Sequence, residues 1–352
     1  MRSDHLAYLV CPTCQGEVRV AGITEGTSEQ ITSGSLSCNA CERTYPIIRS
    51  VPRFVALDNY ASGFGLEWTR HARTQYDSSS RHPLSRRRFF EETRWPRELS
   101  GETIIEVGSG SGRFTEQAAS TGAMVLSLDY SFAVDANYAS NGHRQNVLIV
   151  QGDVLSMPFA RPAAEKLFCF GVLQHTPHPR QAFLSLPRHL KPGGNLVIDV
   201  YRKSFARYVL GTKYWVRPLT RRIPPDRLYR FVQRYIDAAW PVAGVVRRVP
   251  KIGPALNWRL LVADYSAWGL KGDALKEWAV LDTFDMLAPR YDFPQTLQRV
   301  RRWFEEAELV DVVVARGYNG IEGRGSRPSG GLADATDVRV EDRKQASPVV
   351  EA

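Results

Sequence analysis

Apolar and polar residues along positions 100–200 repeat in an order typical of alternating strands and helices. Short apolar runs such as TIIEVG, MVLSLD and VLIVQGD are separated by segments with helical spacing, such as FTEQAAS and AVDANYAS. Apolar strands that alternate with helices at these short intervals predict a mostly parallel sheet with helices on both faces. We therefore expect an α/β, doubly wound fold.

The same pattern divides the chain into four parts. Residues 1–55 hold two cysteine pairs, and residues 56–99 form a polar, helical connector. The α/β domain spans 100–323, and within it residues 201–280 form a helical, basic insertion that is long enough to act as a lid. Residues 324–352 are polar and contain Gly and Ser, so we expect a disordered tail.

The cysteine pairs CPTC and CNAC predict a metal site. Cys11, Cys14, Cys38 and Cys41 are spaced so that four thiolates can converge on one Zn²⁺ in a closed tetrahedron. The alternatives are two disulfides, which a reducing cytoplasm disfavours, or a redox pair. A closed site has no open coordination position, so we expect a structural zinc ribbon. Cys169 lies in the apolar run KLFCFGVL and is expected to be buried in a strand.

The distribution of charge narrows the choice of partner. Residues 201–262 hold fourteen Lys or Arg and two Asp, a local charge of +12, whereas the whole chain carries +9. The Lys and Arg residues alternate with aromatic residues. This composition suits an anionic amphipathic binding partner, such as a small-molecule, glycan-linked or lipid-linked compound, or an anionic membrane surface. The alternative is a helical cap with a solvated basic face. The ribbon has five Arg and five acidic residues, which makes nucleic acid a less favoured partner.

The expected cellular location follows from the lack of long apolar runs in the sequence. No run approaches the roughly 20 residues that a membrane-spanning helix needs. The first ten residues contain no signal-like apolar stretch, and the first cysteine pair follows them directly. We expect a cytoplasmic protein.

A glycine-rich turn, EVGSGSGRF, lies between a buried strand and a helix. A dinucleotide fingerprint would require Gly or Ala at the sixth position from Gly108, where Arg113 stands. The turn instead contains Glu106, Gly108, Gly110 and Gly112 in the spacing E-x-G-x-G-x-G. Glycines allow a ligand to approach the backbone closely. A plain tight turn is the alternative.

Two later strands end in carboxylates that favour a nucleoside-like ligand. Asp129 follows Gly112 by 17 residues and can accept both hydroxyls of a ribose. Asp153 ends the next strand and can meet an adenine edge. Because the carboxyl ends of parallel strands face one crevice, we expect these groups to share a site.

At these motifs the chain resembles the class I methyltransferases that use S-adenosylmethionine. The resemblance covers about residues 100–200 and rests on IIEVGSGSGRFT, LSLDYS, QGDVLSMPF, FCFGVLQHTPHP and LKPGGNLVIDVY. It implies a seven-stranded sheet, with Glu106 and the loop glycines near the methionine part of the cofactor. It also implies that Asp129 binds the ribose, that Asp153 binds the adenine amino group and that Gly171 lines the methyl-transfer cleft.

The ribbon also resembles a known group of modules. The stretch RTYPIIRSVPRFV is similar to the end of small zinc ribbons that are attached to, or act with, tRNA, rRNA and protein methyltransferases. The segments FGLEW, TQYD and LDTFDMLAPRYDFPQT resemble a bacterial group of ribbon-bearing methyltransferases. This resemblance does not identify the substrate.

Three residues are candidates for catalysis. His175 follows the fourth strand in GVLQHTPHP, where a general base would face the ligand crevice. The alternative is a histidine hydrogen-bonded within its loop. Tyr291 and Asp292 lie in LDTFDMLAPRYDFPQT and would belong to an acceptor-binding loop. The alternative for that segment is a salt-bridged turn before the next helix.

The connector has two interpretations. GFGLEWTRHARTQYD predicts a helix that carries Trp68, and Tyr76 follows it. The arginines of SRRRFF would then form a solvated helix face. Alternatively, the connector folds over the cofactor.

Three functions fit these observations. We expect an enzyme that methylates a small or lipid-linked metabolite by in-line transfer from S-adenosylmethionine. The alternatives are an RNA methyltransferase that uses the zinc ribbon to bind its substrate, and a protein that binds S-adenosylmethionine without catalysis.

Overall fold

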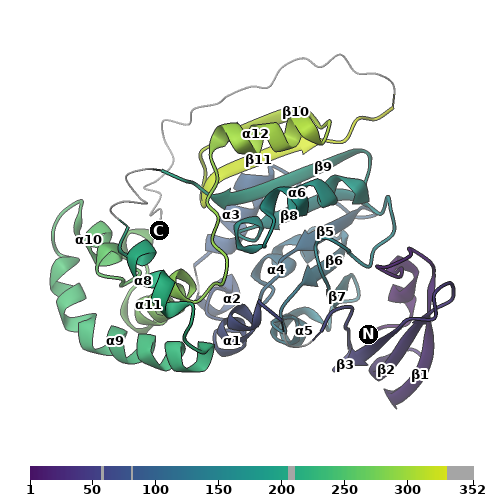
Figure 1. Ribbon diagram of the computed structural model, residues 1–352, viewed down its shortest axis with the longest axis horizontal. Coiled ribbons are helices and arrows are strands. Elements are labelled where there is room, and N and C mark those ends of the chain that lie inside the picture. Colours follow the sequence, from purple (N-terminus) through teal and green to yellow (C-terminus); the bar gives the residue numbers. More distant parts are fainter. Residues whose placement is uncertain (57–58, 81, 205–210, 331–352) are drawn as a thin grey trace.

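A seven-stranded sheet forms the centre of the molecule (Figure 1). The computed structural model describes residues 1–56, 59–80, 82–204 and 211–330. The strands follow the order β10-β11-β9-β8-β5-β6-β7, and only β11 runs antiparallel to its neighbours. This confirms the mostly parallel sheet. The strands are β5 (Thr103–Val107), β6 (Met124–Asp129), β7 (Val147–Gln151), β8 (Ala164–Phe170), β9 (Leu190–Tyr201), β10 (Val310–Ala315) and β11 (Gly320–Ser326).

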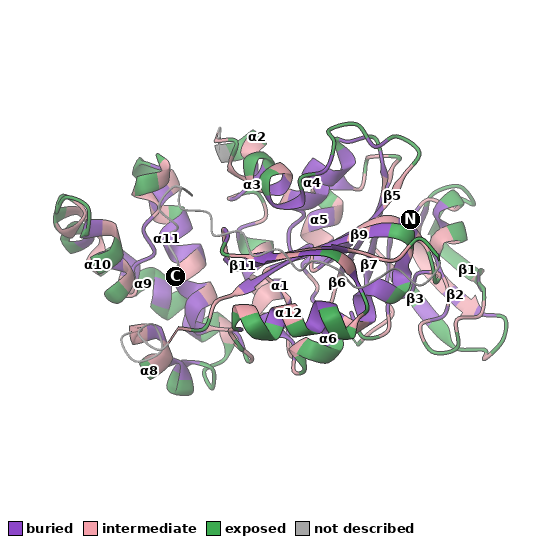
Figure 2. Ribbon diagram, turned by 90° about the horizontal axis from the view of Figure 1, so that it is seen from above, coloured by how far each residue is buried: buried purple, intermediate pink, exposed green. Residues whose placement is uncertain are grey.

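Helices cover both faces of this sheet (Figure 2). One hydrophobic cluster joins α3 (Leu84–Thr93), α4 (Arg113–Ala119) and α5 (Val134–Asn141) to one face. A second cluster joins α6 (Pro179–Ser185) and α12 (Leu297–Glu306) to the other. The central strands are therefore buried on both sides, which explains why their sequences are continuous apolar runs. Cys169 lies in β8 and is fully buried, as predicted.

The N-terminal ribbon packs against the β7 edge of the sheet. Its antiparallel strands are β1 (Val18–Gly26), β2 (Ile31–Cys38), β3 (Thr44–Ile48) and β4 (Val51–Pro52), after a 3₁₀ turn at Asp4–Tyr8.

Arg53 anchors the ribbon at this edge. Its guanidinium donates to Asp135 at 2.5 Å and to Gln151 at 3.1 Å, and its side chain is 1% exposed. The backbone N–H of Phe54 donates to the carbonyl of Gln151 at 2.8 Å. The ribbon thus covers an edge that would otherwise expose unpaired backbone groups.

The insertion after β9 is a helical unit with its own core. It lies at the opposite end of the long axis from the ribbon (Figure 1). Leu228, Val232, Ile236 and Phe284 are buried in one cluster between its helices. The helices continue to Leu287, past the predicted end at residue 280. They are α8 (Thr212–Thr220), α9 (Pro225–Val246), α10 (Gly253–Arg259), a 3₁₀ turn at Ser266–Trp268 and α11 (Gly272–Leu287).

The connector and the C-terminal boundary complete the fold. The connector forms α1 (Ser62–Arg70), α2 (Asp77–Ser80) and α3. β11 extends to Ser326, and the backbone of Arg327 exchanges hydrogen bonds of 2.8 Å with Gly193 and Gly194. Ordered structure therefore continues past residue 324, where the sequence predicted that a disordered tail begins. Residues 331–352 of that predicted tail lie outside the described residues. Within the part of the chain that the structure describes, no helix is both long and apolar enough to cross a membrane.

Candidate functional site

A deep cleft opens where the parallel strands end. Its floor includes the ends of β5, β6 and β8, and helix α1 and the insertion form its other walls. This is the edge at which ligands bind in open α/β sheets. Of the residues predicted to hold the cofactor, five line this cleft: Gly108, Gly110, Asp129, Asp153 and Gly171.

The glycine-rich turn requires its glycines. Gly108, Gly110 and Gly112 all have positive φ angles, which other residues adopt only with strain. A Cβ on Gly110 would lie 3.1 Å from the indole nitrogen of Trp68, so α1 packs directly on the turn. The connector therefore folds over this part of the cleft. Gly112 does not line the cleft, because it begins α4 and faces Asn137.

Asp129 is positioned by hydrogen bonds to its own loop. Its Oδ2 accepts from the N–H of Gly110 at 2.8 Å, and its Oδ1 accepts from the N–H and hydroxyl of Ser131 at 2.8 and 2.7 Å. A carboxylate has about four acceptor sites, so one site on Oδ2 is left for a ligand. The geometry therefore leaves room for a ribose hydroxyl, and the contact to both hydroxyls stays a prediction. Burial raises the pKa of Asp129, against these hydrogen bonds.

Asp153 lies beside an aromatic wall. Its Oδ1 accepts from the N–H of Leu155 at 2.9 Å. The rings of Tyr60 and Tyr130 stack with centroids 4.7 Å apart, and both residues line the cleft with Asp153. Burial raises the pKa of Tyr60, so its phenol stays neutral. A flat apolar ring with a polar edge, such as adenine, fits this corner.

Glu106 does not lie in the cleft. Its carboxylate accepts from the hydroxyl of Thr115 and, at 2.9 Å, from that of Ser127. The side chain is 1% exposed and is not among the residues that line the cleft. Burial raises its pKa to about 7, although both hydroxyls lower it. The expected role beside the methionine part is therefore not supported, because the alternation of β5 turns Glu106 toward α4.

His175 lines the cleft with a defined tautomer. It ends a 3₁₀ turn at Leu173–His175, and its Nδ1 lies 2.9 Å from the carbonyl oxygen of Tyr291. A carbonyl can only accept, so Nδ1 donates to it, and in the neutral tautomer the lone pair of the ring lies on Nε2. The rings of Phe64 and Tyr201 contact the imidazole edge-to-face at 5.1 and 5.3 Å. This arrangement makes Nε2 the ring nitrogen that is available to accept a proton.

Tyr291 and Asp292 are supporting residues rather than residues of the cleft surface. Tyr291 contributes its carbonyl to His175, and its ring contacts Tyr60 edge-to-face at 5.3 Å. The side chain of Asp292 is 3% exposed and accepts from Arg217 at 3.0 Å. Neither residue is among those that line the cleft, so the structure gives no support to a direct catalytic contact by either side chain.

Three acidic side chains, from α1 and from helix α11 of the insertion, also line the cleft. Glu67 on α1 and Asp282 and Asp285 on α11 all line it. Both carboxylate oxygens of Glu67 are buried without a hydrogen-bond partner among the described residues. Burial and the two aspartates raise the pKa of Glu67 well above its usual range. A buried carboxyl group without a partner is costly, so a cationic ligand group would stabilise it.

Cations and aromatic rings form the wall supplied by the insertion. Lys213 and Arg217 lie on the buried face of α8 and line the cleft with Arg202. Tyr201, Tyr214, Trp258 and Tyr265 line the same region. Two other cations of the insertion, Arg221 and Arg222, are exposed and do not line the cleft.

Arg88 corrects the interpretation of the connector arginines. Its side chain is 15% exposed, lines the cleft and donates to Glu92 at 2.5 Å and also to Asp199. Arg88 is therefore not part of a solvated face, whereas Arg86 and Arg87 are exposed as predicted. Asp199 in turn accepts from the N–H of Gly171 at 2.5 Å. Arg88 thus supports the end of β8 through Asp199. The cleft residues that the motifs did not identify include Glu67, Lys213, Arg217 and Arg88.

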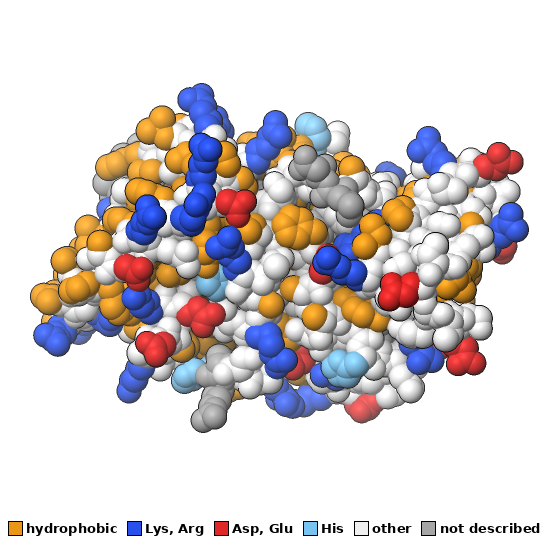
Figure 3. Space-filling view, turned by 90° about the horizontal axis from the view of Figure 1, so that it is seen from below, with side chains coloured by type: hydrophobic (Ala, Val, Ile, Leu, Met, Phe, Trp, Pro, Cys, Tyr) orange, Lys and Arg blue, Asp and Glu red, His pale blue; other side chains and the backbone are white. Residues whose placement is uncertain are grey.

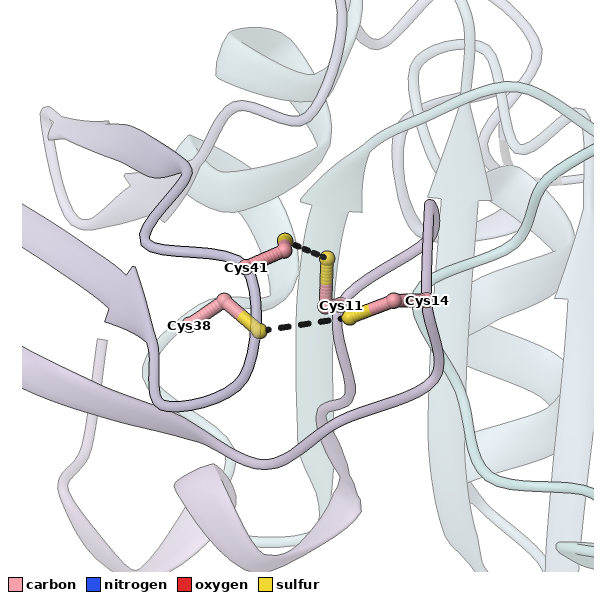
Figure 4. A group of neighbouring side chains, drawn as sticks. All are labelled: Cys11, Cys14, Cys38 and Cys41. Carbon is pink, nitrogen blue, oxygen red and sulfur yellow. Dashed lines mark hydrogen bonds between the residues drawn. The ribbon is translucent and has the colours of Figure 1, made fainter.

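The four predicted metal ligands converge at one point. The Sγ atoms of Cys11, Cys14, Cys38 and Cys41 all lie within 4.8 Å of one another. Figure 4 shows them pointing inward from two turns of the ribbon. Cys11 and Cys41 are 3.6 Å apart, and Cys14 and Cys38 are 3.4 Å apart. These separations fit four thiolates around a single tetrahedral cation.

Comparisons with known proteins give two family matches, one in the ribbon and one in the α/β domain. The methyltransferase domain family matches residues 105–198, and the Trm112p-like protein family matches residues 2–50. The demethylmenaquinone methyltransferase of Thermobifida fusca is 30% identical over 174 residues, which cover 46% of this chain and 73% of that protein.

Other relatives match over shorter parts. The ubiquinone biosynthesis O-methyltransferase of Coxiella burnetii is 26% identical over 122 residues, 33% of this chain and 52% of that protein. A biotin biosynthesis bifunctional protein of Cellvibrio japonicus is 35% identical over 104 residues, and the match covers 30% of this chain and 20% of that protein. The structure of an O-methyltransferase family protein from Burkholderia thailandensis shares 13% identity, with 70% of this chain and 57% of that chain covered and a TM-score of 0.41.

Proposed function

Because the chain belongs to the S-adenosylmethionine-dependent methyltransferases, we propose that it transfers the methyl group of S-adenosylmethionine to a hydroxyl of an anionic small-molecule, glycan-linked or lipid-linked acceptor. The observation that carries this proposal is the tautomer of His175. A lone pair on Nε2 at the cleft surface can take the proton that a hydroxyl loses during methylation. One relative is itself named an O-methyltransferase.

The cleft residues fit the cofactor that this family uses. The free acceptor site of Asp129 suits a ribose hydroxyl, and Asp153 with Tyr60 suits adenine. S-adenosylmethionine also carries an ammonium and a sulfonium, and Glu67 is a buried carboxyl group with no partner among the described residues. A positive ligand charge would favour ionisation of Glu67 and satisfy its oxygens. When bound, the cofactor would supply the activated methyl group.

The protein would promote the reaction mainly by positioning the reactants, excluding water and providing a proton acceptor. Methyl transfer is an in-line displacement, so an acceptor oxygen must be held in line with the methyl group. Helix α1 and the insertion close the cleft from two sides, which limits access of water. The carbonyl of Tyr291 fixes the imidazole of His175 and keeps Nε2 available.

The chemistry of the acceptor follows from the wall opposite the sheet. Lys213, Arg217 and Arg202 bring positive charge to this wall, which Asp292 offsets in part, at 3.0 Å from Arg217 and 3.9 Å from Lys213. Several tyrosines and tryptophans bring apolar surface. Cations bind phosphate or carboxylate groups, and aromatic rings bind apolar or sugar rings. An acceptor with an anionic group next to a hydrophobic or ring-shaped part matches both features.

We also propose that the four cysteines hold one structural Zn²⁺. Four thiolates at these separations close the coordination shell and leave no position for a substrate. The metal would therefore stabilise the ribbon and take no part in methyl transfer.

Methyl transfer from labelled cofactor tests the function. The purified protein is incubated with labelled S-adenosylmethionine and separate fractions of small molecules, lipids and RNA. We expect label in a small-molecule or lipid fraction. Label in RNA alone would favour the RNA methyltransferase, and cofactor binding without labelling in any fraction would favour a non-catalytic binding protein.

A further inference from the structure

The helical insertion exposes an unusual concentration of large hydrophobic side chains. Ten of the thirteen such side chains of the described residues lie between positions 212 and 260. Trp215 and Leu219 on α8 are 63% and 67% exposed, and Val245 on α9 is 63% exposed. Single exposed hydrophobic residues are ordinary, but a group of this kind marks an interaction surface. We call the exposed side chains of residues 212–260 the insertion surface.

Cations accompany these hydrophobic side chains. Figure 3 shows Lys and Arg interleaved with hydrophobic residues over the end of the molecule that the insertion forms. The acids of these helices do not neutralise them, because Asp226 pairs with Arg70 at 3.4 Å and Asp237 pairs with Lys276 at 2.6 Å. Exposed cations of the surface include Arg221, Arg222, Arg230, Arg234 and Lys251.

We propose that the insertion surface binds an anionic lipid bilayer. Its hydrophobic side chains would enter the boundary between headgroups and acyl chains, while the arginines and lysine pair with lipid phosphates. Most of the exposed hydrophobic side chains are aliphatic, whereas surfaces that bind single-stranded RNA rely on stacking aromatic rings. A second copy of the chain fits less well, because it would bring two surfaces of like charge together.

Helix α8 connects this surface to the cleft. Lys213, Arg217 and Thr220 face inward at helical spacing, and the first two line the cleft. Trp215 and Leu219 point to the other side of the same helix, into solvent. A bilayer against α8 would therefore lie one helix away from the acceptor side of the cleft. Binding to lipid does not depend on the proposed methyl transfer and can be measured without cofactor.

Co-sedimentation with lipid vesicles tests the proposal. The full chain is mixed with vesicles of phosphatidylcholine alone or with added phosphatidylglycerol, at low and high salt. We expect binding only to the vesicles with phosphatidylglycerol, and weaker binding as salt rises. The pair Arg230→Gln and Arg234→Gln should lower the partition coefficient about 25-fold, because each cation near an anionic surface contributes about fivefold. The pair Trp215→Ser and Leu219→Ser should lower it roughly tenfold or more.

Matched variants away from the surface provide the controls. Ile23→Ser on β1 removes a side chain that is 41% exposed, and Arg299→Gln with Arg302→Gln removes two exposed cations of α12. Both should bind vesicles like the parent, and equal circular dichroism and thermal unfolding show that each variant folds. Three results would overturn the proposal: no binding to anionic vesicles at low salt, equal binding to neutral vesicles, or RNA binding without vesicle binding. A dimer that Trp215→Ser and Leu219→Ser dissociate, without vesicle binding, would assign the surface to a second copy.

Discussion

At the scale of single residues, His175 is the decisive test of catalysis. The change His175→Ala removes the proposed proton acceptor. It leaves in place every cleft residue that is assigned to the cofactor. We expect kcat to fall by about 10²- to 10⁴-fold, with the dissociation constant of S-adenosylmethionine nearly unchanged. Steady-state kinetics and calorimetric titration measure the two quantities. His178→Asn changes an exposed histidine three residues away and should leave both unchanged. A loss of kcat below about tenfold at every pH would leave His175 with a structural role only.

Asp129 tests the cofactor side of the cleft. The change Asp129→Asn keeps the size of the side chain and removes its charge. A hydrogen bond to a charged group contributes about 1.5–3 kcal/mol, so the dissociation constant of S-adenosylmethionine should rise by about 10- to 150-fold. Asp129→Ala should weaken binding further, because Gly110 and Ser131 would also lose their acceptor. Asp273→Asn, an exposed change on α11, serves as the control in the same titration. Unchanged affinity in Asp129→Asn would remove this residue from the cofactor site.

Glu106 predicts a pH dependence of stability. Its pKa of about 7 lies above the ordinary value of 4.5, chiefly because of burial. Between these values the unfolded chain releases this proton while the folded chain keeps it, so stability falls as pH rises through this window. The change Glu106→Gln should reduce this pH-dependent decrease in the free energy of unfolding by up to about 3 kcal/mol. Urea unfolding at pH 4.5 and pH 7.5 measures it, with the exposed change Glu29→Gln as the control. Parallel pH profiles for Glu106→Gln and the parent would contradict the assignment.

At the scale of structural elements, the ribbon and the sheet edge should depend on each other. Cys38→Ser should release the metal and lower the midpoint of thermal unfolding, because metal-binding energy is folding energy in such modules. Cofactor binding should weaken too, since the ribbon holds Gln151 through Arg53, two residues before Asp153. Elemental analysis, thermal unfolding and titration with S-adenosylmethionine follow the three effects. Cys169→Ser lies outside the ribbon and should keep the metal. Protein purified without chelators that contains no zinc would refute the metal site.

The elements also show how far the sequence determines the site. The loop glycines, Asp129, Asp153, Gly171 and His175 were predictable because parallel strands end at one edge of the sheet, and five of them line the cleft beside His175. The orientation of Glu106 was missed because the motif gives the position of a residue and not the face of β5 on which it lies. Strand alternation with Ile105 and Val107, which pack on the opposite face, contained that information.

Residues contributed by helices were harder to predict. The side chains of Glu67, Lys213 and Arg217 reach the cleft only after α1 and the insertion have packed together. That packing depends on contacts between segments more than a hundred residues apart, such as the 2.8 Å hydrogen bond between Tyr229 and His71. Local periodicity identifies such helices but does not orient them.

At the scale of the whole molecule, α8 separates acceptor binding from surface binding, and charge changes on its two sides should have different effects. Lys213→Gln removes a cation from the cleft wall and should raise the KM for an anionic acceptor about tenfold, the effect of losing one charged contact. Arg221→Glu with Arg222→Glu changes only exposed side chains. This pair should leave the KM for a water-soluble acceptor unchanged and lower the binding of the protein to anionic vesicles. Kinetics and co-sedimentation of both variants test the two sides independently. A raised KM for a soluble acceptor in the Arg221 and Arg222 pair would mean that the outer face of the insertion also contacts the acceptor.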